Sequence, residues 1–316
     1  MLLLADRHNV FSTADARALG YTTRVITRMV HTRQWVRLRR GWYTLGWLWD
    51  AADARAKHVL TARAVMRPLA GRVALTRTSG AVALGLEMWR PTLDSISVVR
   101  LDGRRGAVEH GVTHHEQPRE MGPCLQLDDD LVVAPPTWTV ATAMMDASLE
   151  GAVVIADSAL NRLVSSKPEL DDLAESWQRW PGSRPLRLAV RLADGRAANG
   201  GETLGRIVVF WRFGLPRPEL QYEVHGPNGE VAFTDWAWPE RNVLGEFDGK
   251  RKYMRDALPE EEPGEVVWRE KLREDWIAAA TDTVMRRMIF RDIFRPAQTA
   301  ERFRQALERG ERRRSA

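Results

Sequence analysis

The first fifty residues contain two short helix signals in a row, and this part of the chain restricts the fold most. Ser12 offers a hydroxyl to a helix N-terminus, with the carboxylate of Asp15 three residues later. Gly20 follows the apolar pair at 18–19 and is typical of a helix end. Either threonine of the pair at 22–23 can cap a second helix. The sequence therefore predicts two short helices separated by a tight turn.

A strand–turn–strand pattern follows these helices. Residues 35–38 and 42–45 are strand-like, and the segment Arg39-Arg40-Gly41 between them is a basic turn with the glycine that such turns favour. Two helices and a hairpin in this order predict a winged helix.

The second predicted helix has two different faces. Its apolar stripe consists of Val25, Ile26, Met29 and Val30. Its polar face carries Arg24, Thr27, Arg28 and His31. From Arg24 to Arg40 there are six arginines and no acidic residue, which predicts a positive surface of the kind that binds phosphates. The alternative interpretation is a solvated basic face in an arginine-rich chain.

We expect this region to bind double-stranded DNA. The helix residues that would enter the major groove are Arg24, Thr27, Arg28 and His31. The wing residues that would contact phosphates are Arg37, Arg39 and Arg40.

The composition is that of a folded protein with several domains. The chain has 316 residues, of which 44% are apolar and 28% charged, and its formal net charge is +5. The single cysteine cannot form an internal disulfide, and no run of about 18 apolar residues occurs. We expect a cytoplasmic protein without a membrane-spanning segment. The predicted domains are 1–50, a mixed α/β region at 51–165, a helical linker at 166–184 and a last domain at 185–316.

The last domain contains a set of carboxylates that the strand pattern brings together. A tight turn at 239–242 sets residues whose numbers sum to 481 opposite each other, so Asp235 faces Glu246. Alternation places Glu246, Asp248 and Lys250 on this same face, while Trp236, Trp238, Val243 and Phe247 occupy the other. Oxygen ligands of this kind suit Mg²⁺ or Mn²⁺, with Asp235, Glu246 and Asp248 as the predicted ligands. The alternative is an exposed acidic hairpin balanced by Arg241, Arg251 and Lys252.

The segments 233–239 and 244–250 resemble the core of PD-(D/E)XK nucleases, in particular the branch of the very-short-patch-repair (Vsr-type) endonucleases. The resemblance extends over about 198–295 and implies a restriction-endonuclease-like α/β core. It implies that Asp235 and Glu246 hold the metal, that Asp248 and Glu202 assist, and that Lys250 contacts the phosphate or its water. The sequence departs from the usual motif because Asp248 stands where that motif has lysine.

The segments Phe11–Asp15 and 36–43 are similar to the winged helix of AbiEi-type antitoxins, and residues 51–165 resemble the rest of that family only weakly. This resemblance implies a repressor that binds DNA and opposes a nucleotidyltransferase toxin.

The overall fold prediction is thus an α+β or α/β multidomain chain. Its main functional prediction is a DNA-binding protein with a Mg²⁺-dependent endonuclease domain. The alternative is an antitoxin-like repressor whose nuclease-like domain is not catalytic, and cleavage of RNA is a third option. The predicted partners are double-stranded DNA, a second copy of the chain and, for the repressor, a cognate toxin.

Overall fold

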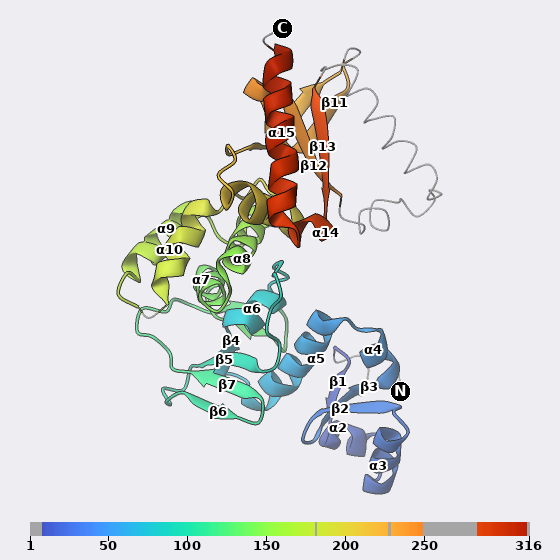
Figure 1. Ribbon diagram of the computed structural model, residues 1–316. Coiled ribbons are helices and arrows are strands. Elements are labelled where there is room, and N and C mark those ends of the chain that lie inside the picture. The colour runs from blue at the N-terminus through green and yellow to red at the C-terminus, as the bar shows by residue number, and fades with distance from the viewer. Residues whose placement is uncertain (1–7, 181, 227–228, 249–282, 315–316) are drawn as a thin grey trace. The chain divides into compact units, whose positions relative to one another are not determined.

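The structure is a computed structural model that describes residues 8–180, 182–226, 229–248 and 283–314 (Figure 1). The chain forms two compact units, Met1–Ile155 with Leu163–Val190 and Ala156–Arg162 with Arg191–Ala316. Several sheets with helices packed on them establish a mixed α/β protein. Three residues that the sequence analysis singled out lie outside the described residues, namely Lys250, Arg251 and Lys252. The sequence pattern also predicts a helix over 265–280, which lies outside them too.

The first unit begins with the predicted arrangement of two helices and a hairpin. Its elements are β1 (Val10–Ser12), α2 (Thr13–Ala18), α3 (Thr23–His31), β2 (Trp35–Arg39) and β3 (Trp42–Leu45), and the strands form an antiparallel sheet in the order β1-β3-β2. Ser12 and Asp15 form the predicted capping box. Gly20 has a φ of +86° and Gly41, in the hairpin turn, has a φ of +78°, which explains why glycine occupies both positions.

Aromatic side chains form the core of this small domain. Trp35 is buried among Phe11, Tyr21 and Tyr43, with its ring centroid 4.7 Å from that of Phe11. Ile26 joins this core from α3. The prediction for Val25 is wrong, because Val25 is 38% exposed whereas Ile26 is 5% exposed. One residue along a helix corresponds to a rotation of about 100°, so the two side chains leave the helix in different directions.

The remainder of the first unit contains a six-stranded mixed sheet in the order β6-β7-β5-β4-β9-β8. Its strands are β4 (Val73–Leu75), β5 (Ile96–Arg100), β6 (Ala107–Glu109), β7 (Val112–His115), β8 (Leu125–Gln126) and β9 (Val132–Val133). The helices of this stretch are α4 (Gly46–Ala51), α5 (Ala54–Met66), η1 (Arg67–Leu69), α6 (Arg77–Ala83), α7 (Pro136–Met145), α8 (Leu149–Asn161), α9 (Lys167–Ser176) and α10 (Ser183–Leu192).

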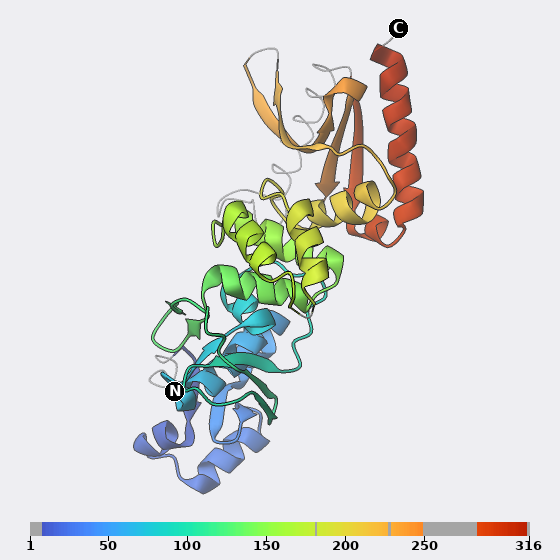
Figure 2. The same cartoon turned by 90° about the vertical axis from the view of Figure 1, so that its left-hand side faces the viewer.

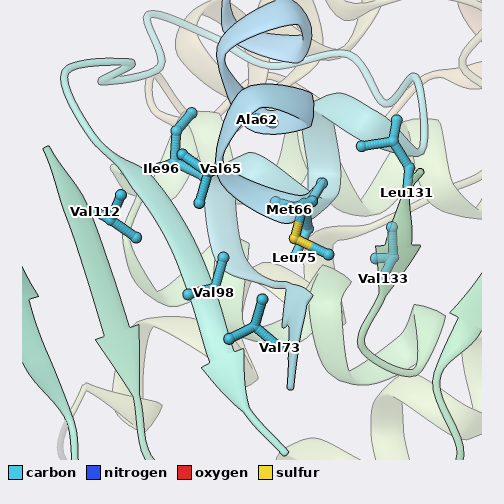
Figure 3. Close-up of a cluster of buried hydrophobic side chains, with 10 residues drawn as sticks. All are labelled: Ala62, Val65, Met66, Val73, Leu75, Ile96, Val98, Val112, Leu131 and Val133. Atoms are coloured by element: carbon cyan, nitrogen blue, oxygen red, sulfur yellow. The ribbon is translucent and has the colours of Figure 1, made fainter. Parts of the chain in front are cut away.

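Helix α5 covers one face of the six-stranded sheet (Figure 3). Ala62, Val65 and Met66 project from the helix toward β4 and β5, and Leu131 and Val133 close the cluster beside β9. Burial of aliphatic side chains in such a cluster contributes about 1.5–3 kcal/mol for each large residue. The sheet is therefore held to α5 by apolar contacts.

The second unit contains a four-stranded sheet in the order β10-β11-β12-β13. Its elements are α11 (Gly200–Leu204), η2 (Gly205–Trp211), β10 (Glu219–His225), β11 (Val231–Trp238), η3 (Pro239–Arg241), β12 (Val243–Asp248), β13 (Val284–Ile289), α14 (Phe290–Ile293) and α15 (Pro296–Arg314). The first three strands are antiparallel and β13 runs parallel to β12. Helix α15 lies along this sheet (Figure 2).

Two details of the second unit differ from the sequence prediction. The sequence pattern predicts one helix over 202–213, and the structure has a short α-helix that continues into η2, a helix of π type. The basic composition of 309–314 predicts a frayed tail, and the structure is helical to Arg314. Gly310 explains part of this order, because a Cβ at that position would lie 2.0 Å from the backbone oxygen of Arg241. The helix is packed closely against the turn between β11 and β12.

Aromatic rings fill the space between the sheet and the helices of this unit. Trp236 and Phe210 make an edge contact with ring centroids 5.0 Å apart, and the ring centroid of Phe303 of α15 lies 4.9 Å from that of Phe210.

In the part of the chain that the structure describes, no helix is long and apolar enough to cross a membrane.

Candidate nucleic-acid interface

Helix α3 presents a polar face to solvent. The side chains of Arg24, Thr27, Arg28 and His31 are all exposed, as predicted. Thr27 donates a hydrogen bond to the carbonyl of Thr23, whereas the guanidinium groups of Arg24 and Arg28 have neither a hydrogen bond nor an ion pair among the described residues. The two guanidinium groups are therefore available to an outside acceptor.

The contacts at the start of α3 hold this face in place. Thr22 is the N-cap, and its hydroxyl accepts a hydrogen bond from the backbone N–H of Val25 at 3.4 Å. Arg17 of α2 donates to the hydroxyl of Thr23 at 3.3 Å. Ile26 anchors the opposite side of the helix in the aromatic core. The helix thus has a capped first turn and one anchored side, so its polar face has a defined orientation.

The wing carries two exposed arginines and one that is turned inward. Arg37 and Arg40 are exposed and have no ion-pair partner in the described ranges. Arg39 is half-buried, and its Nη1 is buried without a hydrogen-bond partner among the described residues. Burial and then the charge of Arg100 lower the pKa of His114 in β7, and the charge of Arg39 lowers it further. Arg39 is thus less accessible than Arg37 and Arg40, the other predicted phosphate-binding residues of the wing.

Two arginines of the six-stranded region are paired instead. Arg63 of α5 bonds both oxygens of Asp128, the shorter contact being 2.6 Å, and Arg100 pairs with Asp102 at 2.7 Å. The first pair assigns a structural role to the acidic segment 128–130. Arg63 and Arg100 therefore have a carboxylate beside them, whereas Arg24, Arg28, Arg37 and Arg40 have none among the described residues.

Arg67 connects the small domain to the rest of the first unit. Its guanidinium donates to the backbone oxygen of Val10, pairs with Asp130 and lies 5.9 Å from the ring centre of Trp42. These contacts hold β1 and β3 against η1 and the β8–β9 segment. Nothing in the local pattern around Arg67 predicts this, because its partners are 57 and 63 residues away in sequence.

The second unit contains the predicted pair of opposed carboxylates. Trp236 pairs with Gly245 and Trp238 with Val243, so the predicted sum of 481 is the observed register. Asp235 and Glu246 are only 7% and 8% exposed, which excludes the exposed acidic hairpin for these two residues. Asp248 is half-buried at the end of β12.

Asp235 and Glu246 each have a partner inside the protein. Oδ2 of Asp235 accepts a hydrogen bond from the backbone N–H of Phe247 at 2.6 Å. Oε2 of Glu246 lies 3.7 Å from a guanidinium nitrogen of Arg287 on β13. Arg241, expected to balance the acids, is paired with Glu311 instead. Positive charge and backbone donors thus reduce the repulsion between the two carboxylates.

Glu202 lies near the start of α11 and is 1% exposed. Its carboxylate accepts hydrogen bonds from the backbone N–H of Ala198 at 2.8 Å, from Asn199 at 2.6 Å and from Gln221 of β10 at 3.2 Å. Gly201, the preceding residue, allows the ring of Phe247 of β12 to pack closely on α11, since a Cβ there would lie 2.1 Å from that ring. Glu202 therefore joins α11 to β10 through hydrogen bonds.

The described residues do not form a metal centre. No group of three or more His, Cys, Asp or Glu side chains in the described ranges is arranged to hold a metal ion. Glu202 has both carboxylate oxygens engaged by protein donors, and Asp235 has one. Lys250, the predicted phosphate contact, lies outside the described residues.

Arg206, four residues after Glu202, forms a buried ion pair that sequence reasoning missed. Arg206 of η2 contacts Oδ2 of Asp157 at 2.6 Å, and both side chains are almost fully buried. The hydroxyl of Thr203 and the backbone N–H of Asp194 also donate to this carboxylate. Burial raises the pKa of Asp157, and Arg206 opposes that effect. Asp157 lies in the part of α8 that belongs to the second unit, so the pair joins this part of α8 to η2 within that unit.

Comparison with known proteins gives two findings. Residues 1–46 match a family described as "Transcriptional regulator, AbiEi antitoxin". Two Mycobacterium tuberculosis proteins, Rv2248 of strain H37Rv and MT2308 of strain CDC 1551, are each 27% identical to the chain over 184 residues. Both are described as uncharacterized. The match covers 56% of this chain and 66% of each relative's own length.

Proposed function

We propose that the chain is a DNA-binding transcriptional regulator of the antitoxin type. The observation that carries this proposal is the exposed polar face of α3, whose arginines Arg24 and Arg28 have no partner among the described residues. An α-helix fits the major groove of B-form DNA, and arginine binds both phosphates and guanine edges there. The family match of residues 1–46 covers this same helix and supports the proposal.

The wing adds to the surface that α3 would present to DNA. Arg37 and Arg40 extend the positive surface from α3 onto the hairpin. No acidic residue interrupts the segment from Arg24 to Arg40, so phosphates meet no local repulsion. In this proposal Arg67 keeps the small domain attached to the six-stranded region while DNA is bound.

Binding to DNA from the chain's own promoter region, measured by fluorescence anisotropy, tests the proposal. The variant Arg24→Ala/Arg28→Ala removes both charges of the α3 face. The matched control is Arg187→Ala/Arg191→Ala on α10, which has the same spacing, charge change and exposure. We expect the α3 variant to lose at least tenfold in affinity and the control to bind as the unmodified protein does. Equal affinities for the two variants would refute the proposal.

A toxin partner is a further part of this proposal. The resemblance to AbiEi-type antitoxins implies a nucleotidyltransferase toxin, and the family description of residues 1–46 supports it. Co-expression of the chain with the product of an adjacent nucleotidyltransferase gene, followed by affinity purification, is the test. Recovery of a stable complex that relieves growth arrest would support it, and persistent arrest without a complex would contradict it.

A metal-dependent nuclease is the second candidate. The observation that favours it is the pair Asp235 and Glu246, two buried carboxylates on neighbouring strands. Burying two like charges is costly, and a bound divalent cation would offset that cost. Supercoiled plasmid with Mg²⁺ or Mn²⁺ is the assay. Nicking that EDTA and Glu246→Gln both abolish would support the nuclease, and intact plasmid would contradict it.

A further inference from the structure

Val25 is an aliphatic side chain exposed on α3, beside the polar face of that helix. It is 38% exposed in the first turn of the helix, although Ile26 beside it is almost completely buried. The aromatic core that receives Ile26 also receives Met29 and Val30, whereas Val25 is not part of that cluster. Val25 therefore makes little contribution to the hydrophobic core of the small domain.

The neighbours of Val25 restrict what can contact it. Arg24 precedes it, and Arg28 lies one helical turn further on, where a residue at i+3 shares the same surface. Both guanidinium groups are exposed and unpaired in the described ranges. A surface that covered Val25 would also cover these charges, so it must offer acceptors or negative charge beside an apolar group.

The major groove of DNA offers this combination. Thymine presents a 5-methyl group there, and guanine presents the N7 and O6 acceptors that arginine binds. In helix-turn-helix proteins the N-terminal residues of the recognition helix contact the base edges. Val25 is the third residue of α3, in the turn that the Thr22 cap holds in place.

We propose that Val25 reads the 5-methyl group of a thymine in the bound site, between bases that Arg24 and Arg28 contact. This inference rests on the proposed function and adds a specificity to it. Removing the methyl group without changing the base pairing isolates the contact, and deoxyuridine in place of thymidine does this.

The experiment begins with selection of a bound duplex from a random DNA library by the full chain. Each thymidine of that duplex is then replaced by deoxyuridine, one position at a time, and affinities are measured for three proteins. These are the unmodified protein, Val25→Ala, and Val108→Ala as the matched control at an exposed valine of β6. Alanine is the strongest helix former, so Val25→Ala keeps α3 intact, as circular dichroism can verify.

We expect one deoxyuridine position to weaken binding by the unmodified protein and by Val108→Ala roughly fourfold, the effect of about one buried methyl group. Val25→Ala should bind the two duplexes equally. An equal effect of deoxyuridine on all three proteins, no effect on any of them, or a selected site without thymine would overturn the inference while leaving DNA binding intact. Failure to bind any duplex would instead overturn the proposed function itself.

Discussion

The wing makes a prediction that separates three neighbouring arginines by their surroundings. Arg37 and Arg40 are exposed and unpaired in the described ranges, whereas Arg39 is half-buried with Nη1 enclosed. If the exposed pair contacts phosphates, Arg37→Ala/Arg40→Ala removes two charged contacts. Arg39→Ala changes the same charge per residue but removes no phosphate contact. The two variants therefore differ in their effect on the salt dependence of DNA binding.

The magnitude follows from counterion release. Each phosphate contact contributes about 0.9 to the slope of log affinity against log salt concentration, so loss of two contacts lowers the slope by about 1.8. Between about 50 and 200 mM salt, this makes the fall in affinity about twelvefold smaller for the double variant than for the unmodified protein. For Arg39→Ala we expect an unchanged slope.

Fluorescence anisotropy with one labelled duplex at four or more salt concentrations gives these slopes directly. Thermal unfolding of each variant is the control, because Arg39→Ala removes a half-buried side chain and can lower stability without touching DNA. An Arg39→Ala slope that falls by about 0.9, or a double variant that keeps the full slope, would refute the assignment of the wing arginines.

Three predictions concern stability, each measured by urea unfolding. Arg206→Met should lower the free energy of unfolding by about 3–5 kcal/mol, because it leaves Asp157 buried without its counter-charge. Adding Asp157→Asn should recover much of this loss in stability. Gly201→Ala should lower the free energy of unfolding by about 1–3 kcal/mol, because the added Cβ would collide with the ring of Phe247. Burial, above all, lowers the pKa of His115 to about 4, so the folded state resists protonation. Stability should fall as the pH drops from about 6.5 to 4, less so in His115→Gln.

Much of the local structure follows from short-range sequence signals. The Ser12 cap, the Gly20 stop and the Gly41 turn depend on neighbouring residues alone, so the pattern predicts them correctly. The register of Asp235 opposite Glu246 was predictable for the same reason, because a tight turn determines which residues face each other. The exposed polar face of α3 also follows from helical periodicity, which fails only at Val25.

The tertiary structure decides what surrounds each charge. The sequence predicts equal roles for Arg37, Arg39 and Arg40, and only the folded structure shows that Arg39 is half-buried with its Nη1 enclosed. The partners of Arg67 and Arg206 lie tens of residues away, where no periodic pattern connects them. Amphipathic periodicity reports which face of an element is apolar, but pairing and burial depend on which other elements pack there. The sequence alone therefore determines the winged helix and its positive face, and the tertiary structure determines which arginines remain available to bind DNA.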